Sequence, residues 1–345
     1  MKQPFQLGLT RDFLTPEGKL TYKDIGLSVL ESHPNIQHRF LDKHEPVVQA
    51  SQIKDFDAII SLTPAWKPET LKGAERFLSV VRFGVGYDGV DVPSCTEADV
   101  LLCITAGAVN HPVAEATVMW MLALSHKVRI KDRLTREGRW AERSNHMGTE
   151  LRDHTLGVVG VGGIGGKLVE LLRGFGMKQP LAFDPFLTPQ RATELGVKLV
   201  PLDQLLKDSD FISVNCPLTD KTRNLIGRDQ LALMKPTSYL INTARGGIVN
   251  EAALIEVLKA RAIAGAATDV YETEPVKAGH PFAELDNVIL APHSIAWTDE
   301  LFRDIGRMAC HIATRLAVGE VPPGVINKEV LERKGFKEKL AKFRN

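Results

Sequence analysis

Three side chains in the second half of the sequence suit the chemistry of an alcohol or a carbonyl group: Arg245, Glu274 and His293. Arg245 opens an Arg-Gly-Gly turn after the apolar run SYLINTA, where a guanidinium can bind a carboxylate with two hydrogen bonds. His293 follows NVILAP, and an imidazole can transfer a proton near neutral pH. Glu274 lies nineteen residues before His293 and could accept the other imidazole N–H, which would orient the ring. Hydride transfer at a carbon that bears a hydroxyl needs such a proton carrier and such a cation.

Each of these residues also has an interpretation without chemistry. Arg245 could be a surface arginine beside a turn, and His293 a buried histidine satisfied by its neighbours. Asp269 ends the apolar run AIAGAATD, where it could accept a hydrogen bond from a nicotinamide carboxamide. The alternative for Asp269 is an ordinary N-cap or turn aspartate.

A glycine motif lies upstream of these residues, in GVVGVGGIGGKLVELLRGFG at positions 157–176. Gly160, Gly162 and Gly165 form Gly-x-Gly-x-x-Gly between an apolar strand and an apolar-periodic helix, which is the context of a dinucleotide-binding turn. Gly160 would permit the tight turn, Gly162 the approach of a pyrophosphate, and Gly165 close packing of helix and strand. The helix N-terminus would add partial positive charge toward the phosphates.

An acidic residue at the right distance strengthens this interpretation. Asp184 lies nineteen residues after Gly165, at the end of the strand LAFD, where its carboxylate could accept hydrogen bonds from the adenosine ribose. It would repel a 2′-phosphate, and Pro185 and Phe186 follow it with no adjacent arginine. The sequence therefore predicts NAD rather than NADP.

Alternating apolar runs and amphipathic segments predict βαβ units that position these residues. Strands are expected at 57–62, 77–84 and 100–105, and seven more between 154 and 292, in HTLGVVGV, QPLAFDP, KLVPL, DFISVNC, SYLINTA, AIAGAATDV and NVILAP. A long helix is expected from His111 to about Arg133, an irregular polar stretch at 138–151, and an amphipathic helix after Thr298. The three chemical residues would all follow strands of the second series.

Length and composition limit the class of protein. A chain of 345 residues predicts two domains, and 43 basic against 42 acidic side chains give a net charge of +1, which favours neither nucleic acid nor a membrane as partner. The basic tail at 331–345 is expected to be a solvated terminal helix. Four cysteines without CxxC spacing predict no metal site and no disulfide framework. The N-terminus lacks the pattern of a signal peptide, so a soluble, cytoplasmic protein is expected.

With these motifs in this order, the sequence resembles the D-isomer-specific 2-hydroxyacid dehydrogenase family over nearly its whole length. The matching segments are VRFGVGYDGVDV at 81–92, VAEAT at 113–117, GVGGIG at 160–165, FDP at 183–185, CPLTDKTRNLI at 216–226, INTARGGIVNEAAL at 241–254, ATDVYETEP at 267–275 and LAPH at 290–293. The resemblance implies that Arg245 binds and polarises the substrate, that His293 is the acid/base, and that Glu274 orients it.

The resemblance also implies contacts for substrate and cofactor. Backbone amides around Val85 and Gly86 would hold the substrate carboxylate across an interdomain cleft. The residues that would bind the cofactor fall into four groups. They are Gly160, Gly162, Gly163, Ile164 and Gly165 for the turn and pyrophosphate, Asp184 for the ribose, Cys216, Pro217 and Thr222 for the adenine and phosphate side, and Thr243 and Asp269 for the nicotinamide side.

The fold implied is α/β with two Rossmann-like domains: an NAD-binding, doubly wound parallel sheet inserted in a smaller, flavodoxin-like substrate domain. The first part of the substrate domain would cover residues 1–108, the NAD domain 109–298, and a C-terminal return 299–345. Relatives dimerise through the NAD domain, so a homodimer is expected, formed by the long helix and an arm at 138–151.

The sequence departs from the family near His293, where Ser294, Ile295, Ala296 and Trp297 replace the usual small residues and would narrow the pocket. Ile60 stands at the apparent position of a basic residue in phosphoglycerate-using relatives, which weakens a phosphorylated substrate. Trp66 could project into the cleft or pack in its loop, and the roles of Trp140 and Trp297 in selectivity stay open.

The leading hypothesis is reduction of a short 2-keto acid such as glyoxylate or hydroxypyruvate, or oxidation of the corresponding 2-hydroxy acid. A dehydrogenase of a phosphorylated hydroxy acid such as phosphoglycerate, or of a compact anion such as phosphite, is the alternative enzyme. The formate branch replaces the acidic partner of the histidine, and Glu274 disfavours it. An NAD-sensing binding module without catalysis is the alternative from another class, which the set of Arg245, Glu274 and His293 disfavours.

Overall fold

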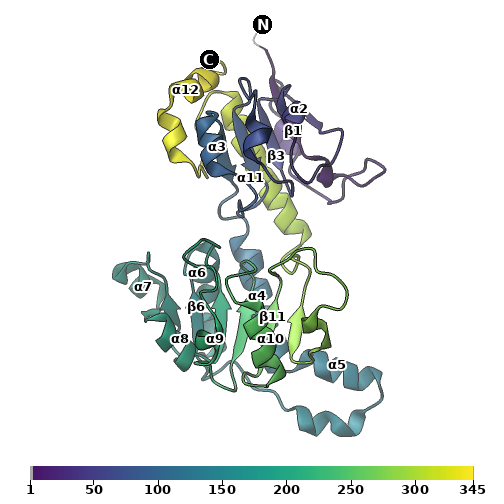
Figure 1. The fold of residues 1–345 in the computed structure, drawn as a ribbon, viewed down its shortest axis with the longest axis vertical. Helices are drawn as coiled ribbons and strands as arrows, with labels where there is room; N and C mark the ends of the chain where they lie inside the picture. The colour runs from purple at the N-terminus through teal and green to yellow at the C-terminus, as the bar shows by residue number, and fades with distance from the viewer. Residues whose placement is uncertain (1–2, 345) are drawn as a thin grey trace. The chain divides into compact units, whose positions relative to one another are not determined.

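The computed structural model describes residues 3–344, and the chain forms two compact units. Unit 1 contains the residues up to Val109 and those from Trp297 onward, and unit 2 contains Asn110–Ala296. The chain thus leaves unit 1 once, builds unit 2, and returns (Figure 1).

Unit 1 is built on a five-stranded parallel sheet in the order β2-β1-β3-β4-β5. Its strands are β1 Phe5–Leu9, β2 Ile36–Phe40, β3 Ala58–Ser61, β4 Ser79–Arg82 and β5 Leu101–Ile104. Its helices are η1 Arg11–Phe13, α1 Ser28–Glu31, α2 Ala50–Ile53, η2 Pro68–Leu71, α3 Val92–Glu97, α11 Asp299–Ala317, η6 Lys328–Glu332 and α12 Lys334–Ala341. This strand order is that of flavodoxin-like sheets, as predicted.

Unit 2 is built on a seven-stranded parallel sheet in the order β12-β11-β10-β9-β6-β7-β8. The strands are β6 Leu156–Val159, β7 Leu181–Phe183, β8 Lys198–Leu199, β9 Phe211–Val214, β10 Tyr239–Asn242, β11 Gly265–Thr268 and β12 Val288–Leu290. Counted from β6, this is the doubly wound order of dinucleotide-binding sheets with one strand added. All seven strands predicted for this region are confirmed.

Neighbouring strand residues point to opposite faces of the unit 2 sheet, and both faces carry apolar side chains. Helices therefore cover both faces. All the helices of unit 2 are α4 Asn110–Ser125, α5 Val128–Arg136, η3 Trp140–His146, α6 Gly163–Leu171, η4 Leu172–Phe175, α7 Pro189–Leu195, α8 Leu202–Asp208, α9 Arg228–Leu231, α10 Glu251–Lys259 and η5 Pro281–Glu284, of which α5 and η3 form an arm beside α4. Val158 packs with residues of α4 and α6 in one core cluster, whereas Val159 packs with residues of α8 and α10 in the other. The strand ends between these layers are therefore rigidly placed.

Two strands of unit 1 were not predicted. β1 is a short buried strand near the N-terminus, and β2 exposes three of its five residues at the edge of the sheet. An edge strand with polar side chains, IQHRF, lacks both the alternation and the apolar run by which strands are recognised.

The single long helix predicted from His111 to Arg133 is wrong, because the chain breaks it into α4 and α5. Lys127 between them has a φ of 55° and a ψ of 40°, a left-handed conformation that no helix interior contains. Helix α4 buries residues such as Trp120 and Met121, whereas α5 buries only Leu134. The apolar first half of the predicted segment therefore packs in unit 2, and its charged second half forms a separate helix.

The prediction of a solvated C-terminal helix is also wrong for part of its length. Helix α12 buries Phe336, Lys339 and Leu340. The Lys339 Nζ donates hydrogen bonds to the carbonyl oxygens of Ala74, Phe77, Ala98 and Asp99, at 2.8, 3.0, 2.8 and 3.2 Å. The tail is an integral part of unit 1 as far as residue 344; Asn345 lies outside the described residues.

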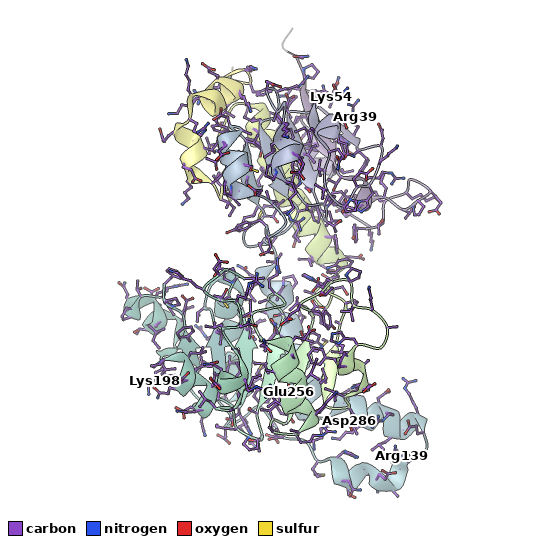
Figure 2. The ribbon with its side chains drawn as sticks, in the orientation of Figure 1. Arg39, Lys54, Arg139, Lys198, Glu256 and Asp286 are labelled. Atoms are coloured by element: carbon purple, nitrogen blue, oxygen red, sulfur yellow. The ribbon has the colours of Figure 1, made fainter. Side chains whose placement is uncertain are left out.

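Charged side chains of both signs are spread over the two units (Figure 2). Three of those labelled on unit 2 form local ion pairs: Glu256 with Arg228, Asp286 with Arg261, and Arg139 with Glu137 and Glu142. Among residues 3–344, no helix is long and apolar enough to cross a membrane. Within the same range, no group of three or more His, Cys, Asp or Glu side chains is placed to hold a metal ion.

Candidate active site

The residues selected from the sequence gather at one edge of the unit 2 sheet. The glycine turn follows β6, Cys216 follows β9, Arg245 follows β10, Asp269 follows β11 and His293 follows β12. All these strands are parallel neighbours, so their carboxyl ends lie side by side. This edge is where open α/β sheets bind ligands.

His293 and Glu274 form a hydrogen-bonded pair in this structure. The Nδ1 of His293 lies 2.7 Å from the Oε2 of Glu274. The other carboxylate oxygen, Oε1, accepts a hydrogen bond from the backbone N–H of Tyr271 at 2.9 Å. The side chains of His293 and Glu274 are 46% and 34% exposed, so the pair is open to a small molecule. The carboxylate thus holds the imidazole through its Nδ1, and the Nε2 on the other side of the ring stays available for proton transfer.

Asp269 holds the backbone that follows His293. Its Oδ1 accepts from the backbone N–H of Ser294 at 2.9 Å, and both of its oxygens lie 3.2 Å from the N–H of Ile295. These bonds stabilise the turn in which His293 adopts a left-handed φ of 54°, which histidine occupies less often than glycine. Burial raises the pKa of the Asp269 carboxyl group, although the two N–H groups and His293 oppose this shift.

Arg245 lies in a turn shaped by Asn242. The Asn242 side chain accepts from the Ala244 N–H at 3.1 Å and donates to the Arg245 carbonyl at 3.1 Å. The guanidinium Nη1 donates to the Ala244 carbonyl at 2.7 Å. Asn242 is buried, with 5% exposure, and its side chain bonds to the backbone on both sides of this turn. These bonds fix how the chain bends after β10. Sequence reasoning did not identify Asn242, although it stands at the end of a strand that was predicted.

The three motif glycines have the geometry that each predicted role requires. Gly160 has a φ of 90°, and a Cβ there would lie 2.8 Å from the Cys216 nitrogen. A Cβ on Gly165 would lie 2.3 Å from the Gly160 carbonyl oxygen, so helix α6 and strand β6 pack too closely for any side chain. A Cβ on Gly162, the N-cap of α6, would meet no atom within 4 Å, which leaves room over the helix N-terminus for a phosphate.

Asp184 lies beside this turn. Its Oδ2 accepts from the Val161 N–H at 2.8 Å, and its Oδ1 accepts from the Phe186 N–H at 2.9 Å. Gly163 and Ile164 begin α6, and a Cβ on Gly163 would lie 2.5 Å from the Asn110 amide group. The open space at Gly162 next to the Asp184 carboxylate fits a dinucleotide whose ribose hydroxyls donate to that carboxylate.

The other predicted cofactor residues line the same edge. Thr222 donates to the Pro217 carbonyl at 2.7 Å and thereby closes the loop after β9. Burial raises the pKa of the Cys216 thiol to about 11, so it stays protonated and unreactive. The Thr243 hydroxyl lies 3.5 Å from that of Thr117 on α4.

Val85 and Gly86 belong to unit 1, in the loop after β4. The Gly86 carbonyl accepts from the Arg82 Nε at 2.9 Å, and the Arg82 Nη1 donates to the Ser61 carbonyl at 2.8 Å. Arg82 therefore links this loop to the end of β3 within unit 1.

The tryptophans differ in exposure. Trp66 is fully buried, donates to the Ser61 hydroxyl at 3.0 Å and stacks on Phe77, so the alternative in which it packs is correct. Ile60 is 1% exposed within β3, so this position cannot present a side chain to a substrate. Trp297 is 53% exposed and packs edge-on against Phe302, and Trp140 is 65% exposed.

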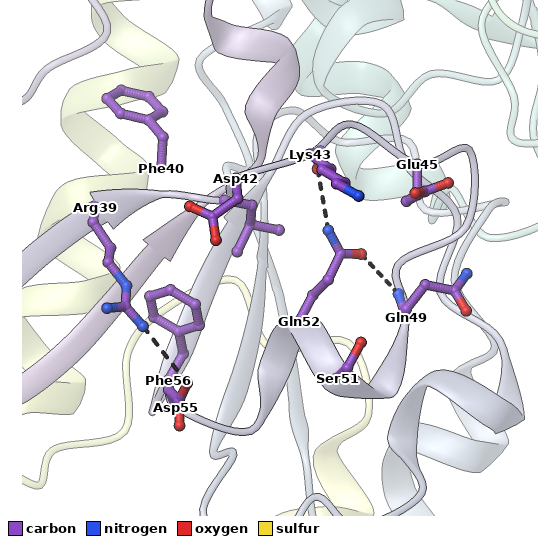
Figure 3. A pocket seen from close by; sticks show the side chains of 11 residues that line it. Arg39, Phe40, Asp42, Lys43, Glu45, Gln49, Ser51, Gln52, Asp55 and Phe56 are labelled. Atoms are coloured by element: carbon purple, nitrogen blue, oxygen red, sulfur yellow. Dashed lines mark hydrogen bonds and ion pairs between the residues drawn. The ribbon is translucent and has the colours of Figure 1, made fainter.

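A hollow in unit 1 contains none of the predicted residues. Figure 3 shows it beside β2 and α2, where Gln52 bonds to the Lys43 carbonyl and the Gln49 N–H, and Arg39 pairs with Asp55 at 3.8 Å. These polar groups bind one another, and none of the residues selected for chemistry is among the lining residues. The strand edge of unit 2 is therefore the better candidate site.

Comparison with known proteins identifies the family of the chain. The family described as D-isomer specific 2-hydroxyacid dehydrogenase, NAD binding domain, matches residues 118–294. A glyoxylate reductase of Korarchaeum cryptofilum is 36% identical over 89% of this chain and 94% of its own. A D-3-phosphoglycerate dehydrogenase of Archaeoglobus fulgidus is 37% identical over 86% of this chain and 54% of its own.

A solved structure of similar fold is the NAD-dependent formate dehydrogenase of Staphylococcus aureus in complex with NAD. It has a TM-score of 0.76 and 30% identity, and covers 90% of this chain and 95% of its own. The chain belongs to the D-isomer specific 2-hydroxyacid dehydrogenase family. It is an NAD-dependent oxidoreductase that acts on the CH–OH group of its donor.

Proposed function

We propose that this protein reduces a short 2-keto acid, of the glyoxylate or hydroxypyruvate type, to the D-2-hydroxy acid, and catalyses the reverse oxidation. The 2.7 Å pair of His293 Nδ1 and Glu274 Oε2, at the sheet edge that carries the glycine turn, is the observation that supports it best. Several relatives that are 36–37% identical bear the name glyoxylate reductase, which favours the small substrate.

The roles follow from the chemistry of each side chain. Bound NADH supplies the hydride that reaches C2 of the keto acid. Arg245 binds the substrate carboxylate and stabilises the charge that develops on the carbonyl oxygen. His293 donates the Nε2 proton to that oxygen, and Glu274 stabilises the ring in the orientation this transfer needs. In the oxidation direction His293 accepts the same proton. The amides around Val85 and Gly86 are proposed as additional carboxylate donors.

The proposed contacts with NAD lie on the glycine turn and on the loops that follow the neighbouring strands of unit 2. Gly162, Gly163 and Ile164 would offer the α6 N-terminus to the pyrophosphate, and Asp184 would accept from the adenosine ribose. The loop of Cys216, Pro217 and Thr222 would border the adenine side, and Thr243 with Asp269 the nicotinamide side. Because Asp269 already binds two backbone N–H groups, its contact with a carboxamide would use a remaining lone pair.

The test is NADH oxidation by the purified protein with glyoxylate, hydroxypyruvate, pyruvate, larger 2-keto acids and 3-phosphohydroxypyruvate, with NADPH in parallel. The proposal predicts the highest kcat/KM for glyoxylate or hydroxypyruvate with NADH. A preference for 3-phosphohydroxypyruvate would instead support the phosphoglycerate alternative, which relatives such as that of Archaeoglobus fulgidus represent. Tight NADH binding without turnover of any acid would support a sensing module.

We also propose that the protein is a homodimer formed by α4, α5 and the η3 arm. The arm exposes large apolar side chains, with Trp140 65% and Met147 73% exposed, and both line a hollow with Leu134. Such exposed apolar surface is typical of an interface. Light scattering after gel filtration should give the mass of a dimer, and Trp140→Glu should give a monomer. A monomeric wild-type protein at micromolar concentration would contradict this.

A cytoplasmic location is the last part of the proposal. The four cysteines are free, and three of them are buried, which fits a reducing compartment. Fractionation of the source cells with an antibody against the protein tests it, and recovery outside the cytoplasm would contradict it.

A further inference from the structure

One tyrosine contacts every segment that carries a proposed catalytic side chain. Tyr271 follows β11 and lies three residues before Glu274. We propose that Tyr271 is a positioning residue, which holds Glu274 and the chain segment of His293 in fixed relative positions through two hydrogen bonds. The inference rests on the proposed reaction, in which the Glu274–His293 pair transfers the proton.

The first bond is made by the backbone of Tyr271. Its N–H donates to the Glu274 Oε1 at 2.9 Å, while the Glu274 Oε2 faces His293 Nδ1 at 2.7 Å. The carboxylate is thus held from both sides, and the position of Tyr271 determines how far Glu274 reaches toward the imidazole.

The second bond is made by the side chain. The Tyr271 hydroxyl donates to the Ala291 carbonyl at 2.9 Å, two residues before His293. Tyr271 is only 8% exposed, and burial raises the pKa of its hydroxyl to about 12, so it is a neutral donor at any working pH. A single residue therefore connects the loop of Glu274 to the strand end that carries His293.

The third contact involves the turn of Arg245. A Cβ on Gly246 would lie 1.8 Å from the Tyr271 carbonyl oxygen, so the Arg-Gly-Gly turn packs directly on the Tyr271 backbone. Movement of Tyr271 would therefore displace Arg245 as well as Glu274.

The loop of Tyr271 is anchored on its other side to helix α10. The Glu251 N–H donates to the Glu272 carboxylate at 3.0 Å, and the Glu272 N–H donates to the Glu251 carboxylate at 3.1 Å. The His280 Nε2 lies 3.1 Å from the Glu251 Oε1, and its ring packs edge-on against Tyr271. The loop is fixed by α10 at one end, and the hydroxyl bond to Ala291 fixes it to the chain just before His293, as Asp269 does to the chain just after it.

The test is Tyr271→Phe, which removes one oxygen atom and keeps the ring. The matched control is Tyr239→Phe in β10: Tyr239 is also 8% exposed, and its hydroxyl has no hydrogen-bond partner within residues 3–344. Loss of one neutral hydrogen bond that positions the pair should lower kcat about three- to tenfold. The dissociation constant for NADH, measured by fluorescence, should not change, and Tyr239→Phe should change neither quantity.

A double-mutant cycle separates positioning from a general loss of structure. If Tyr271 acts through Glu274, then Tyr271→Phe in a Glu274→Gln background should lower kcat by less than about twofold. Equal losses in both backgrounds, or a Tyr271→Phe kcat equal to that of wild type, would overturn the role, even if the variant melts at a lower temperature. A wild-type protein that reduces no 2-keto acid would overturn the proposed function itself, and this role with it.

Discussion

At the level of single residues, the structure joins side chains that are distant in sequence. Glu274 and His293 lie on different loops, and their contact depends on the adjacent ends of β11 and β12. Asp269 contributes by holding the two N–H groups after His293. The proposed catalytic pair lies on loops and is supported by a group directly after a strand, which holds the chain that carries the imidazole.

Replacing His293 by Gln should abolish most of the activity. If His293 transfers the proton, kcat should fall about 10²–10⁴-fold, because the amide cannot act as a general acid or base. NADH binding should persist, because the glycine turn and Asp184 are unaffected. Steady-state kinetics and fluorescence titration measure the two effects, and a kcat near that of wild type would remove His293 from this role.

Asp184→Ser should relax the preference for NADH over NADPH. The carboxylate repels a 2′-phosphate, and the hydroxyl of serine does not. The ratio of kcat/KM for the two cofactors should therefore shift toward NADPH. Because Asp184 also binds the Val161 and Phe186 N–H groups, the melting temperature serves as a control for damage to the turn. A variant that still rejects NADPH as strongly as wild type would show that Asp184 is not the discriminator.

Residue types and spacing were sufficient to select Glu274 and His293, because catalysis limits which side chains can carry a proton. Tyr271 and Asn242 were not selected, since their importance depends on carbonyl and amide groups that come close only in three dimensions. Trp66 illustrates the same limit: its burial against Phe77 is a property of packing that its position in the sequence does not reveal.

At the level of elements, the sequence predicted the strands of unit 2 well because parallel strands covered on both faces are apolar throughout. Examples are β9 and β10, whose four residues are all buried. It failed for β2, which is polar because it is an edge strand, and for the junction of α4 and α5. Lys127 at this junction has a left-handed φ of 55°, which a lysine within an apparently continuous helical pattern does not indicate.

Helix α12 provides a prediction about stability. Lys339→Met should lower the free energy of unfolding by about 2 kcal/mol, because buried carbonyl groups lose their donor. Urea denaturation measures this. Lys337→Met on the same helix is the control, since its ammonium group pairs with the exposed Glu332 carboxylate at the surface. Equal stability of the two variants would contradict a specific role for the Lys339 contacts.

The same lysine predicts a pH dependence. Burial lowers the pKa of Lys339 to about 8 from its ordinary value of 10.5. Between these pH values the unfolded chain binds more protons than the folded chain, so stability rises with pH. The difference in unfolding free energy between wild type and Lys339→Met should therefore grow from pH 8 to pH 10. A difference that stays constant or shrinks over this range would show that the folded chain keeps Lys339 in the ammonium form, held by its four carbonyl contacts.

At the level of the whole molecule, the alternation of strands and helices predicted parallel sheets, and the series of strands after the glycine motif predicted a doubly wound one. The flavodoxin-like first sheet was implied by the family resemblance instead, because β1 and β2 were not recognised as strands. In the unit 2 sheet the strand order reverses between β6 and β9, so the loops after these two strands lead to opposite sides. The glycine turn follows β6 and Cys216 follows β9, so both lie at this switch point. This is the position at which doubly wound sheets bind their ligands.

The most direct test of the account is the fate of the hydride. The protein is incubated with hydroxypyruvate and NADH that carries deuterium at both C4 positions, and the glycerate formed is analysed by mass spectrometry and for its chirality. The account predicts deuterium at C2 of D-glycerate, and formation of the same labelled product about 10²–10⁴-fold more slowly by the His293→Gln variant. Unlabelled glycerate, the L-isomer, or no product from any 2-keto acid despite NADH binding would contradict it.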